Sequence, residues 1–325
     1  MEENRGWRWG VNRWIVLALI ILNAVTAAYI SPVRPHVQLP PEVTGYIGSF
    51  AWVNTLTAML ITDAIVLLIA FIVNRSATSG NLVPTGFAGA VEALLEAIYN
   101  LTESTAGRAA RTIFPFFASI TIYVLIANWM EIIPGVDSIG IIEHAIGEGG
   151  HAIARFGPFI SIVQGEGEYA LVPYVRTLTT DLNFTVGLAL FAVFMIQVVG
   201  LQALGVGYLK KFFNVSTFFS RPVFGVIDFF VGILELVSEF SKILSFSFRL
   251  FGNLFAGTVL LFVIGSLVPV FAQSIFIMLE FFVGLIQALV FGLLTMVFMS
   301  MATHGHEEHE EHEEEEMPIE GPEMI

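Results

Sequence analysis

The sequence contains no cysteine and few charged residues. Without cysteine, the chain can form no disulfide, no thiolate nucleophile and no cysteine-ligated metal or iron–sulfur centre. Only 13 % of the 325 residues are charged, about half the share of a soluble globular protein. The formal net charge is −14 and no basic patch is present, which argues against nucleic acid as a partner. The sequence also has no Gly-x-x-x-x-Gly-Lys loop, and we expect no cofactor and no bound metal.

Long apolar runs make up most of the chain. A membrane-spanning helix needs about 20 mostly apolar residues, and three runs have that length: Phe50–Val73, Thr112–Ile133 and Leu182–Leu209. Two further runs, Val223–Val268 and Val270–Ala302, are too long for an upright span. Val223–Val268 is about twice the required length, so it forms either two helices or one long, strongly tilted helix. The predicted fold class is an all-α integral membrane protein with five to six hydrophobic helices, the two C-terminal ones long and strongly tilted.

Polar segments divide the chain into three regions. Residues 1–49 comprise Trp14–Ile30, which reads as an uncleaved helix or as a signal peptide behind three arginines, and a proline-rich linker. Residues 50–302 form the membrane domain. Residues 303–325 form an acidic, histidine-rich tail, which we expect to be a solvated polyanion in preference to a metal site. With a cytoplasmic N-terminus, nine Lys and Arg residues fall on the cytoplasmic side and three on the other, which places the tail in the cytoplasm.

Two connecting segments are too polar to span a membrane. Phe87–Leu101 has apolar residues at helical spacing and glutamates on the other side, which predicts an amphipathic helix. This helix either lies at the membrane interface or packs against the chain's own helices. Pro134–Thr180 is rich in glycine and acidic residues, and this composition predicts a long exposed loop.

The first long run contains four charged residues at steps of seven: Asp228, Glu235, Lys242 and Arg249. With Ser245 they lie on one face of a helix. This face must meet protein or water, because charge at the bilayer centre costs a few kcal/mol or more. Lys242 could simply pair with Glu235 or Glu239. Arg249 has no carboxylate near it on its C-terminal side, stays protonated, and therefore needs an anion from another helix or another subunit.

The last apolar run repeats the seven-residue spacing with Gln273, Glu280 and Gln287. Glu280 is the only acidic residue between Glu239 and the tail. A carboxyl group desolvated in this helix could exchange protons near neutral pH. The alternative is that Glu280 only pairs with Arg249 or Lys242.

The segment Ser245–Gly257, SFSFRLFGNLFAG, resembles the signature of subunit a, the membrane channel subunit of F-type ATP synthase. Other segments resemble the same family, and the likeness extends from Phe50 to Ala302. They are Ala77–Gly80, Asn128–Pro134, Asp181–Asn183, Gln287-Ala288 and Ser300–Ala302.

The resemblance implies a function and partners. The chain is expected to be a non-catalytic, multi-pass subunit in the cell inner (plasma) membrane, with membrane lipid, the rotating c-ring and the b-type peripheral stalk subunits as partners. It would carry ions, protons in preference to other ions, through two half-channels that couple the gradient to ATP synthesis. The alternative is an independent secondary ion transporter, which should show internal repeats and paired broken helices. The sequence shows neither.

The resemblance also assigns roles to residues. Arg249 matches the arginine that meets the c-ring carboxylate, Asn253 the asparagine one turn further on, and Glu235 the glutamate of the cytoplasmic half-channel. Polar positions of the third span and of the last helix are matched by Asn128, Glu131, Glu280 and Gln287. The full expected ion-translocation set adds Ser245 and Lys242 from the charged face. Thr258 departs from the family, because many members carry a titratable residue at this position.

Overall fold

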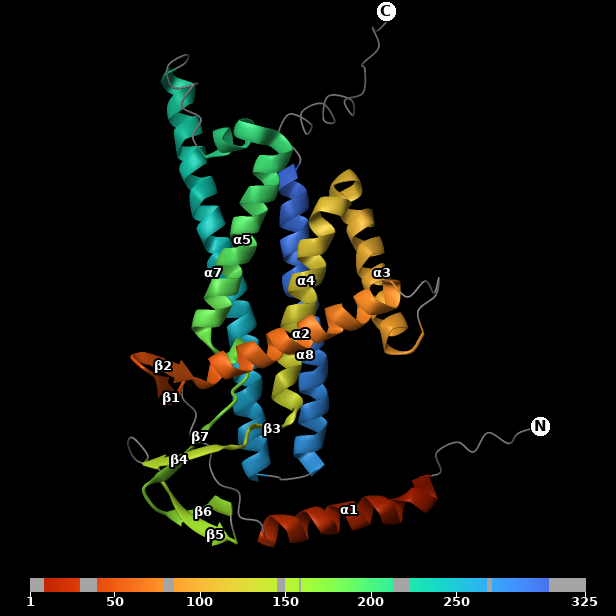
Figure 1. Ribbon diagram of the computed structural model, residues 1–325, viewed down its shortest axis with the longest axis vertical. Coiled ribbons are helices and arrows are strands. Elements are labelled where there is room, and N and C mark those ends of the chain that lie inside the picture. The colour runs from red at the N-terminus through yellow and green to blue at the C-terminus, as the bar shows by residue number, and fades with distance from the viewer. Residues whose placement is uncertain are drawn as a thin grey trace, which may run out of the picture. The chain divides into compact units, whose positions relative to one another are not determined.

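The computed structural model describes residues 9–29, 40–78, 85–144, 150–157, 159–212, 222–267 and 271–303. Helices dominate this part of the chain (Figure 1). Five helical segments in it are long and apolar enough to cross a membrane. The predicted all-α integral membrane fold is therefore confirmed. The tail, residues 304–325, lies outside the described residues, so the prediction of a solvated polyanion stays a prediction.

The N-terminal part contains two helices and a β-hairpin. Helix α1 covers Trp9–Tyr29, and its two interpretations, an uncleaved helix and a signal peptide, stay predictions. Strands β1 (Val43–Ile47) and β2 (Phe50–Val53) pair antiparallel. Helix α2 (Asn54–Thr78) follows directly, so the predicted second span begins four residues later than Phe50. Asn54 fixes this boundary, because its side chain accepts from the Glu42 N–H at 3.2 Å and donates to the Glu42 carboxylate at 3.2 Å.

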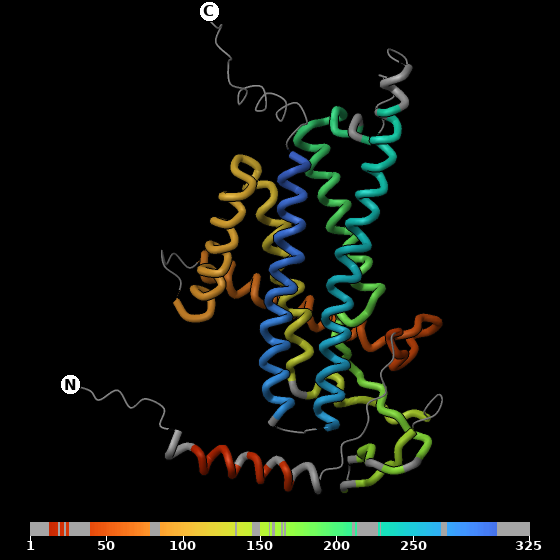
Figure 2. Tube along the Cα trace, turned by 180° about the vertical axis from the view of Figure 1, so that it is seen from behind, coloured from red at the N-terminus to blue at the C-terminus, as the bar shows by residue number. Residues whose placement is uncertain are grey.

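The amphipathic segment forms helix α3 (Phe87–Ala106). A short 3-10 turn, η1 (Gly107–Ala109), connects it to helix α4 (Ala110–Trp129). Gly107 has φ +50, a conformation that a side chain would disfavour. Figure 2 shows α3 folding back along the beginning of α4, and Tyr99 meets Phe114 edge-on at 5.2 Å between ring centroids. Helix α3 thus packs against the chain's own helices, one of the two predicted alternatives.

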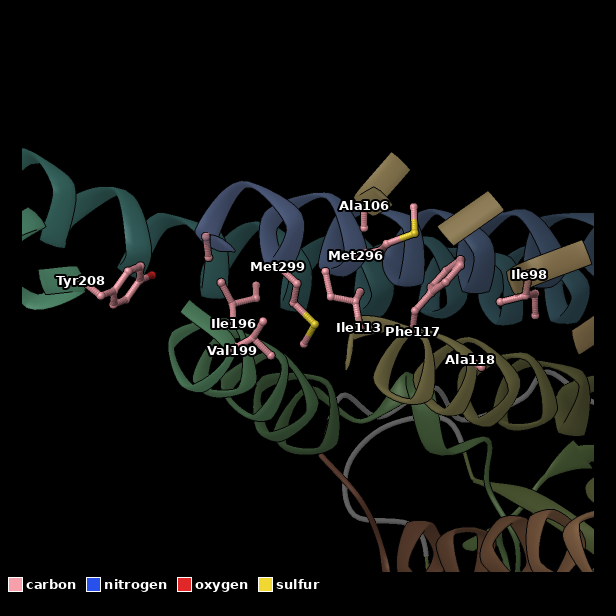
Figure 3. Packing of buried hydrophobic residues seen from close by; sticks show 11 residues of the cluster. Ile98, Ala106, Ile113, Phe117, Ala118, Ile196, Val199, Tyr208, Met296 and Met299 are labelled. Carbon is pink, nitrogen blue, oxygen red and sulfur yellow. The ribbon is translucent and has the colours of Figure 1, made fainter. Parts of the chain in front are cut away.

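A buried apolar cluster joins α3 and α4 to the helices that follow. Figure 3 shows its side chains following one another in a row along the helices, with Ile196 and Met299 towards one end and Phe117 and Ile98 towards the other. These side chains come from helices α3, α4, α5 (Leu182–Leu204) and α8 (Phe271–Thr303). Close packing of such aliphatic and aromatic groups supplies the contacts that hold membrane helices together, since lipid tails are as apolar as the side chains.

The prediction of a long loop over Pro134–Thr180 is wrong. After a short 3-10 turn, η2 (Met130–Ile132), the chain forms strands β3 (Pro134–Asp137), β4 (Gly140–His144), β5 (His151–Phe156), β6 (Phe159–Glu166) and β7 (Tyr169–Pro173). Four of them pair antiparallel in the order β4-β7-β5-β6. The glycines that suggested a loop are needed for strand pairing. At Gly140 and Gly167 a Cβ atom would collide with the backbone of the neighbouring segment.

The C-terminal half is built from long helices. After η3 (Leu178–Thr180), α5 and η4 (Gly205–Lys211), the chain forms α7 (Pro222–Leu267) and α8. Helix α7 is one unbroken helix of 46 residues (Figure 1), which decides between the two predicted alternatives. At 1.5 Å per residue it measures about 69 Å, roughly twice the apolar thickness of a bilayer. A helix of this length must tilt or project from the membrane.

The chain falls into two compact units by residue contacts. The first unit comprises Met1–Val66, Tyr123–Leu182 and Leu250–Gln287. The second comprises Leu67–Ile122, Asn183–Arg249 and Ala288–Ile325. The predicted site residues are divided between them, and each group is described within its own unit.

Candidate functional site

The second unit holds the charged face of α7. Arg249 is only partly buried, and its Nη2 donates to Ser245 Oγ at 3.2 Å, one turn earlier on the same helix. Among the described residues no carboxylate forms an ion pair with Arg249. The expectation that its counter-ion comes from another helix or another subunit stays a prediction.

Lys242, the other cation of α7, has its partners nearby. Its Nζ lies 2.8 Å from Glu239 Oε1, one turn earlier, and 4.6 Å from the ring centroid of Phe298 on α8. Glu239 is buried. This geometry supports the pairing alternative for Lys242, and its role in ion translocation stays a prediction. Glu235 is half-buried on the same helix, and the side chain of Asp228 lies outside the described part of the structure.

The first unit holds the polar face of α8, which meets small and polar residues of α7 at three levels. Asn253 Nδ2 donates to Gln287 Oε1 at 2.8 Å. Gly257 faces Glu280, and a Cβ atom there would lie 2.5 Å from both carboxylate oxygens. Gly265 faces Gln273, with a corresponding distance of 3.1 Å to Nε2. As the residue numbers rise along α7, those of the facing residues on α8 fall, so these parts of the two helices pack antiparallel.

Helix α4 closes this arrangement from a third side. Asn128 Nδ2 donates to the Gly284 carbonyl at 3.0 Å, and Trp129 Nε1 donates to the Phe281 carbonyl at 3.1 Å. The rings of Trp129 and Phe281 stack at 4.6 Å. A Cβ at Gly284 would lie 3.2 Å from Asn128 Cβ, so the glycine permits the close approach of α4 and α8.

Glu131 and Glu280 bring two carboxyl groups to this junction. Thr258 of α7 donates to Glu131 Oε1 at 2.7 Å, and the two glutamates lie close enough for their charges to repel each other. Glu280 is 5 % exposed and Gln287 is 4 % exposed. Four buried polar atoms here have no hydrogen-bond partner among the described residues: Asn128 Oδ1, Glu131 Oε2, Glu280 Oε2 and Gln287 Nε2.

Unpartnered polar atoms in an apolar junction indicate chemistry beyond packing. A buried polar atom without a hydrogen bond costs about 1–3 kcal/mol, and more if it is charged. Protons or water molecules would relieve that cost at the two carboxyl groups. The junction of α4, α7 and α8, called here the carboxyl junction, is therefore suited to bind and release protons. It consists of Asn128, Glu131, Asn253, Gly257, Thr258, Glu280 and Gln287.

Sequence reasoning located these residues but missed some of their contacts. Thr258 stands where many family members carry a titratable residue, and in the structure its hydroxyl holds the carboxyl group of Glu131 at this junction. The partner of Thr258 lies 127 residues away in sequence, so no local pattern could have revealed it. Glu239 was named as one possible partner of Lys242, and its i, i+3 spacing was a usable signal.

Asp137, a titratable residue outside the membrane helices, has a raised pKa. Asp137, in β3, is half-buried, and burial raises its pKa from 3.8 to about 6. The guanidinium of Arg176 opposes this shift in pKa, while the carboxylate of Glu42 adds to it. Asp137 also has φ 57, in the left-handed region.

Comparison with known proteins gives a consistent result. The family model for the ATP synthase A chain matches residues 56–300. ATP synthase subunit a of Buchnera aphidicola subsp. Acyrthosiphon pisum (strain APS) is 29 % identical over 295 residues, which cover 86 % of this chain and 96 % of that protein. ATP synthase subunit a of Alteromonas mediterranea is 31 % identical over 263 residues, or 80 % of this chain and 87 % of that protein. The corresponding protein of Acinetobacter baumannii is 30 % identical over 248 residues, or 74 % and 78 %.

Proposed function

Because this multi-pass membrane chain belongs to the ATP synthase A chain family, we propose that it works in the Fo sector of an ATP synthase and conducts protons through two half-channels. In this proposal the c-ring turns past the chain, and the proton gradient drives ATP synthesis. The chain itself catalyses no reaction. Its partners are the c-ring, the b-type peripheral stalk subunits and membrane lipid. It lies in the plasma membrane with its C-terminus in the cytoplasm.

The observation that carries the proposal is the surroundings of the Arg249 side chain. A permanently charged side chain sits in an apolar helix, and among the described residues only the hydroxyl of Ser245 is bonded to it. In the proposed mechanism the missing anion is a c-ring carboxylate, which is drawn to Arg249 after it has lost its proton. The fixed positive charge also repels protons and so prevents a short circuit between the half-channels.

The carboxyl junction supplies the outer half-channel. A proton from the outer side reaches Glu280 and Glu131, passes Gln287 and Asn253, and neutralises a c-ring carboxylate. The neutral acid can then rotate into lipid, because the cost of desolvating a charge is gone. The unpartnered oxygens of Glu131 and Glu280 support this assignment, since they leave sites where a proton or a water can bind.

Glu235 supplies the inner half-channel. After almost a full turn the c-ring acid loses its proton towards the cytoplasm near Glu235, and the resulting anion returns to Arg249. Each elementary charge that crosses 100 mV is worth about 2.3 kcal/mol, so several protons must pass for each ATP. Lys242 belongs to the expected ion-translocation set, and its ion pair with Glu239 supports a structural role for it in this proposal.

The test is acid-driven, ionophore-sensitive ATP synthesis in proteoliposomes that contain the whole complex. Arg249→Ala should abolish coupled synthesis while the complex still assembles. Ser241→Ala on the same helix is the matched control, because its hydroxyl donates to the Val237 carbonyl within the helix and it belongs to no part of the proposed path, so it should retain most of the activity. Near-normal synthesis by assembled Arg249→Ala complexes would refute the proposal.

A further inference from the structure

The hairpin of β1 and β2 exposes a group of large apolar side chains at its tip. Tyr46 is 73 % exposed, Ile47 is 64 % exposed and Phe50 is 58 % exposed. The residues at the other end of the two strands are half-buried, so exposure rises towards the turn. Large apolar side chains gathered on a surface mark a contact with another protein or with a membrane. The hairpin tip, defined here as residues 46–50, is therefore a candidate interaction surface.

The exposed side chains lie on both faces of the hairpin. Across the two strands Ile47 pairs with Phe50, and Tyr46 pairs with Ala51. Neighbouring residues of a strand point to opposite faces, so Ile47 and Phe50 share one face while Tyr46 lies on the other. A folded partner that docks on the hairpin would cover one face. A medium that surrounds the tip would cover both.

The base of the hairpin is attached to the beginning of α2. Asn54, the first residue of α2, exchanges two side-chain hydrogen bonds with Glu42, and the indole of Trp52 donates to the Thr57 hydroxyl at 2.9 Å. Figures 1 and 2 show the hairpin projecting from this end of α2. The apolar surface continues along α2, where Leu60 is exposed as well. The tip is thus held near the end of a helix that is long and apolar enough to cross a membrane.

The hairpin has the composition of a segment at a bilayer surface. Residues 43–53 include no charged residue and three aromatic ones, Tyr46, Phe50 and Trp52. Tyr and Trp are enriched at the level of the lipid headgroups. Within the described part of the chain β1 and β2 pair only with each other, so their outward N–H and C=O groups need water or headgroups and cannot enter the hydrocarbon core. The suitable depth is therefore the interfacial layer.

We propose that the hairpin tip inserts into the interfacial layer of the bilayer and anchors the adjoining end of α2 at a fixed depth. The partner is lipid: the headgroup region accepts the Tyr46 hydroxyl, and the upper acyl chains receive Ile47 and Phe50. The distance permits this contact, because Phe50 precedes Asn54 by four residues, or about 13 Å of extended chain. The contact concerns lipid alone and does not depend on whether the chain conducts protons.

Spin labels on single introduced cysteines test this contact, because the chain has no cysteine of its own. Tyr46→Cys and Phe50→Cys place a nitroxide on each face of the tip, in the assembled complex, cleared of other reactive thiols and reconstituted in phosphatidylcholine vesicles. Power saturation of the nitroxide signal measures its collisions with oxygen, which concentrates in lipid, and with a water-soluble nickel chelate. Ile139→Cys is the matched control, because Ile139 is as exposed as Ile47 but lies in the turn between β3 and β4. Leu67→Cys, at an exposed position of α2, is the reference for lipid.

We expect the ratio of oxygen to nickel collisions at both tip labels to exceed that at residue 139 severalfold and to stay below that at residue 67. A ratio equal to that at residue 139 would overturn the proposal, because the tip would then lie in water. Protection from both reagents, on one face or on both, would also overturn it, because a protein would then cover the tip. Ile47→Cys reports on the same face as Phe50→Cys if the latter does not assemble. The labels report no proton movement, so failure of the Arg249 test would refute the proposed function and leave the lipid contact to be judged separately.

Discussion

Substitution of Gly257 by alanine tests whether α7 makes room for the carboxyl group of Glu280. The added Cβ atom would lie 2.5 Å from both carboxylate oxygens and 2.6 Å from Cδ. Ordinary van der Waals contact begins about 1 Å further away. Glu280 must therefore move, because the backbone of α7 is held in a continuous helix.

The size of the effect follows from two opposing terms. Overpacking a close contact costs about 1–3 kcal/mol. Replacing a helical glycine by alanine returns up to about 1 kcal/mol through helix propensity. The net loss of stability should thus be small, between about 0 and 2 kcal/mol. Proton transfer is more sensitive, since a misplacement near 1 Å can reduce a rate about a hundredfold. We expect conductance to fall much more than stability.

The measurement is proton uptake driven by a potential in vesicles stripped of the catalytic sector, together with the thermal stability of the intact complex. Gly187→Ala is the matched control, because it makes the same substitution in helix α5 where nothing lies within 4 Å of the new Cβ. Gly257→Ala should reduce conductance at least tenfold relative to Gly187→Ala, with similar assembly. Glu280→Asp added to Gly257→Ala should recover part of the loss, because the shorter side chain relieves the contact. Equal conductance in the two glycine variants would refute the reasoning.

Two further predictions concern other charged groups. Lys242→Met should destabilise the assembled complex by about 3–5 kcal/mol, because the buried carboxylate of Glu239 loses the cation that lies 2.8 Å from it. The thermal midpoint should recover when Glu239→Leu is added, and a stable single variant would contradict the pairing. Burial raises the pKa of Asp137 from 3.8 to about 6, so the folded state binds this proton more tightly than the unfolded state. The protonated Asp137 therefore adds at most about 3 kcal/mol to the free energy of unfolding. This contribution is complete below pH 3.8 and is lost as the pH rises through about 6. Asp137→Asn should therefore stabilise the purified chain at pH 7 and lose that advantage towards pH 4; an advantage that is independent of pH would contradict the assignment.

The long apolar helices could be predicted from the sequence because bilayer thickness sets a length that apolar runs must satisfy. The same argument could not decide whether Val223–Val268 was one helix or two, since length alone permits both. For Pro134–Thr180 the composition led to the wrong prediction of a loop. Strands in this segment are short, and glycines such as Gly140 and Gly167, required by close strand pairing, carry the compositional signal of a loop.

The candidate site was predicted as sets of residues but not as contacts. Seven-residue spacing correctly placed Glu280 and Gln287 on one polar face of α8. It could not show that Asn253 and Gly257 of α7 lie opposite them, because the register between two helices depends on packing along their whole length. The hydrogen bond from Thr258 to Glu131 depends on that register too.

Helix α7 contains two cations, and their different surroundings explain why only one suits the proposed mechanism. Lys242 has a carboxylate at 2.8 Å on its own helix and an aromatic ring at 4.6 Å. It therefore offers little net charge to an approaching anion. Arg249 has only a hydroxyl from Ser245 among the described residues. At an effective dielectric constant near 20, a carboxylate brought within about 4 Å of it would gain about 4 kcal/mol. That attraction is strong enough to select the ionised form of a passing acid, yet weak enough for protonation to release it.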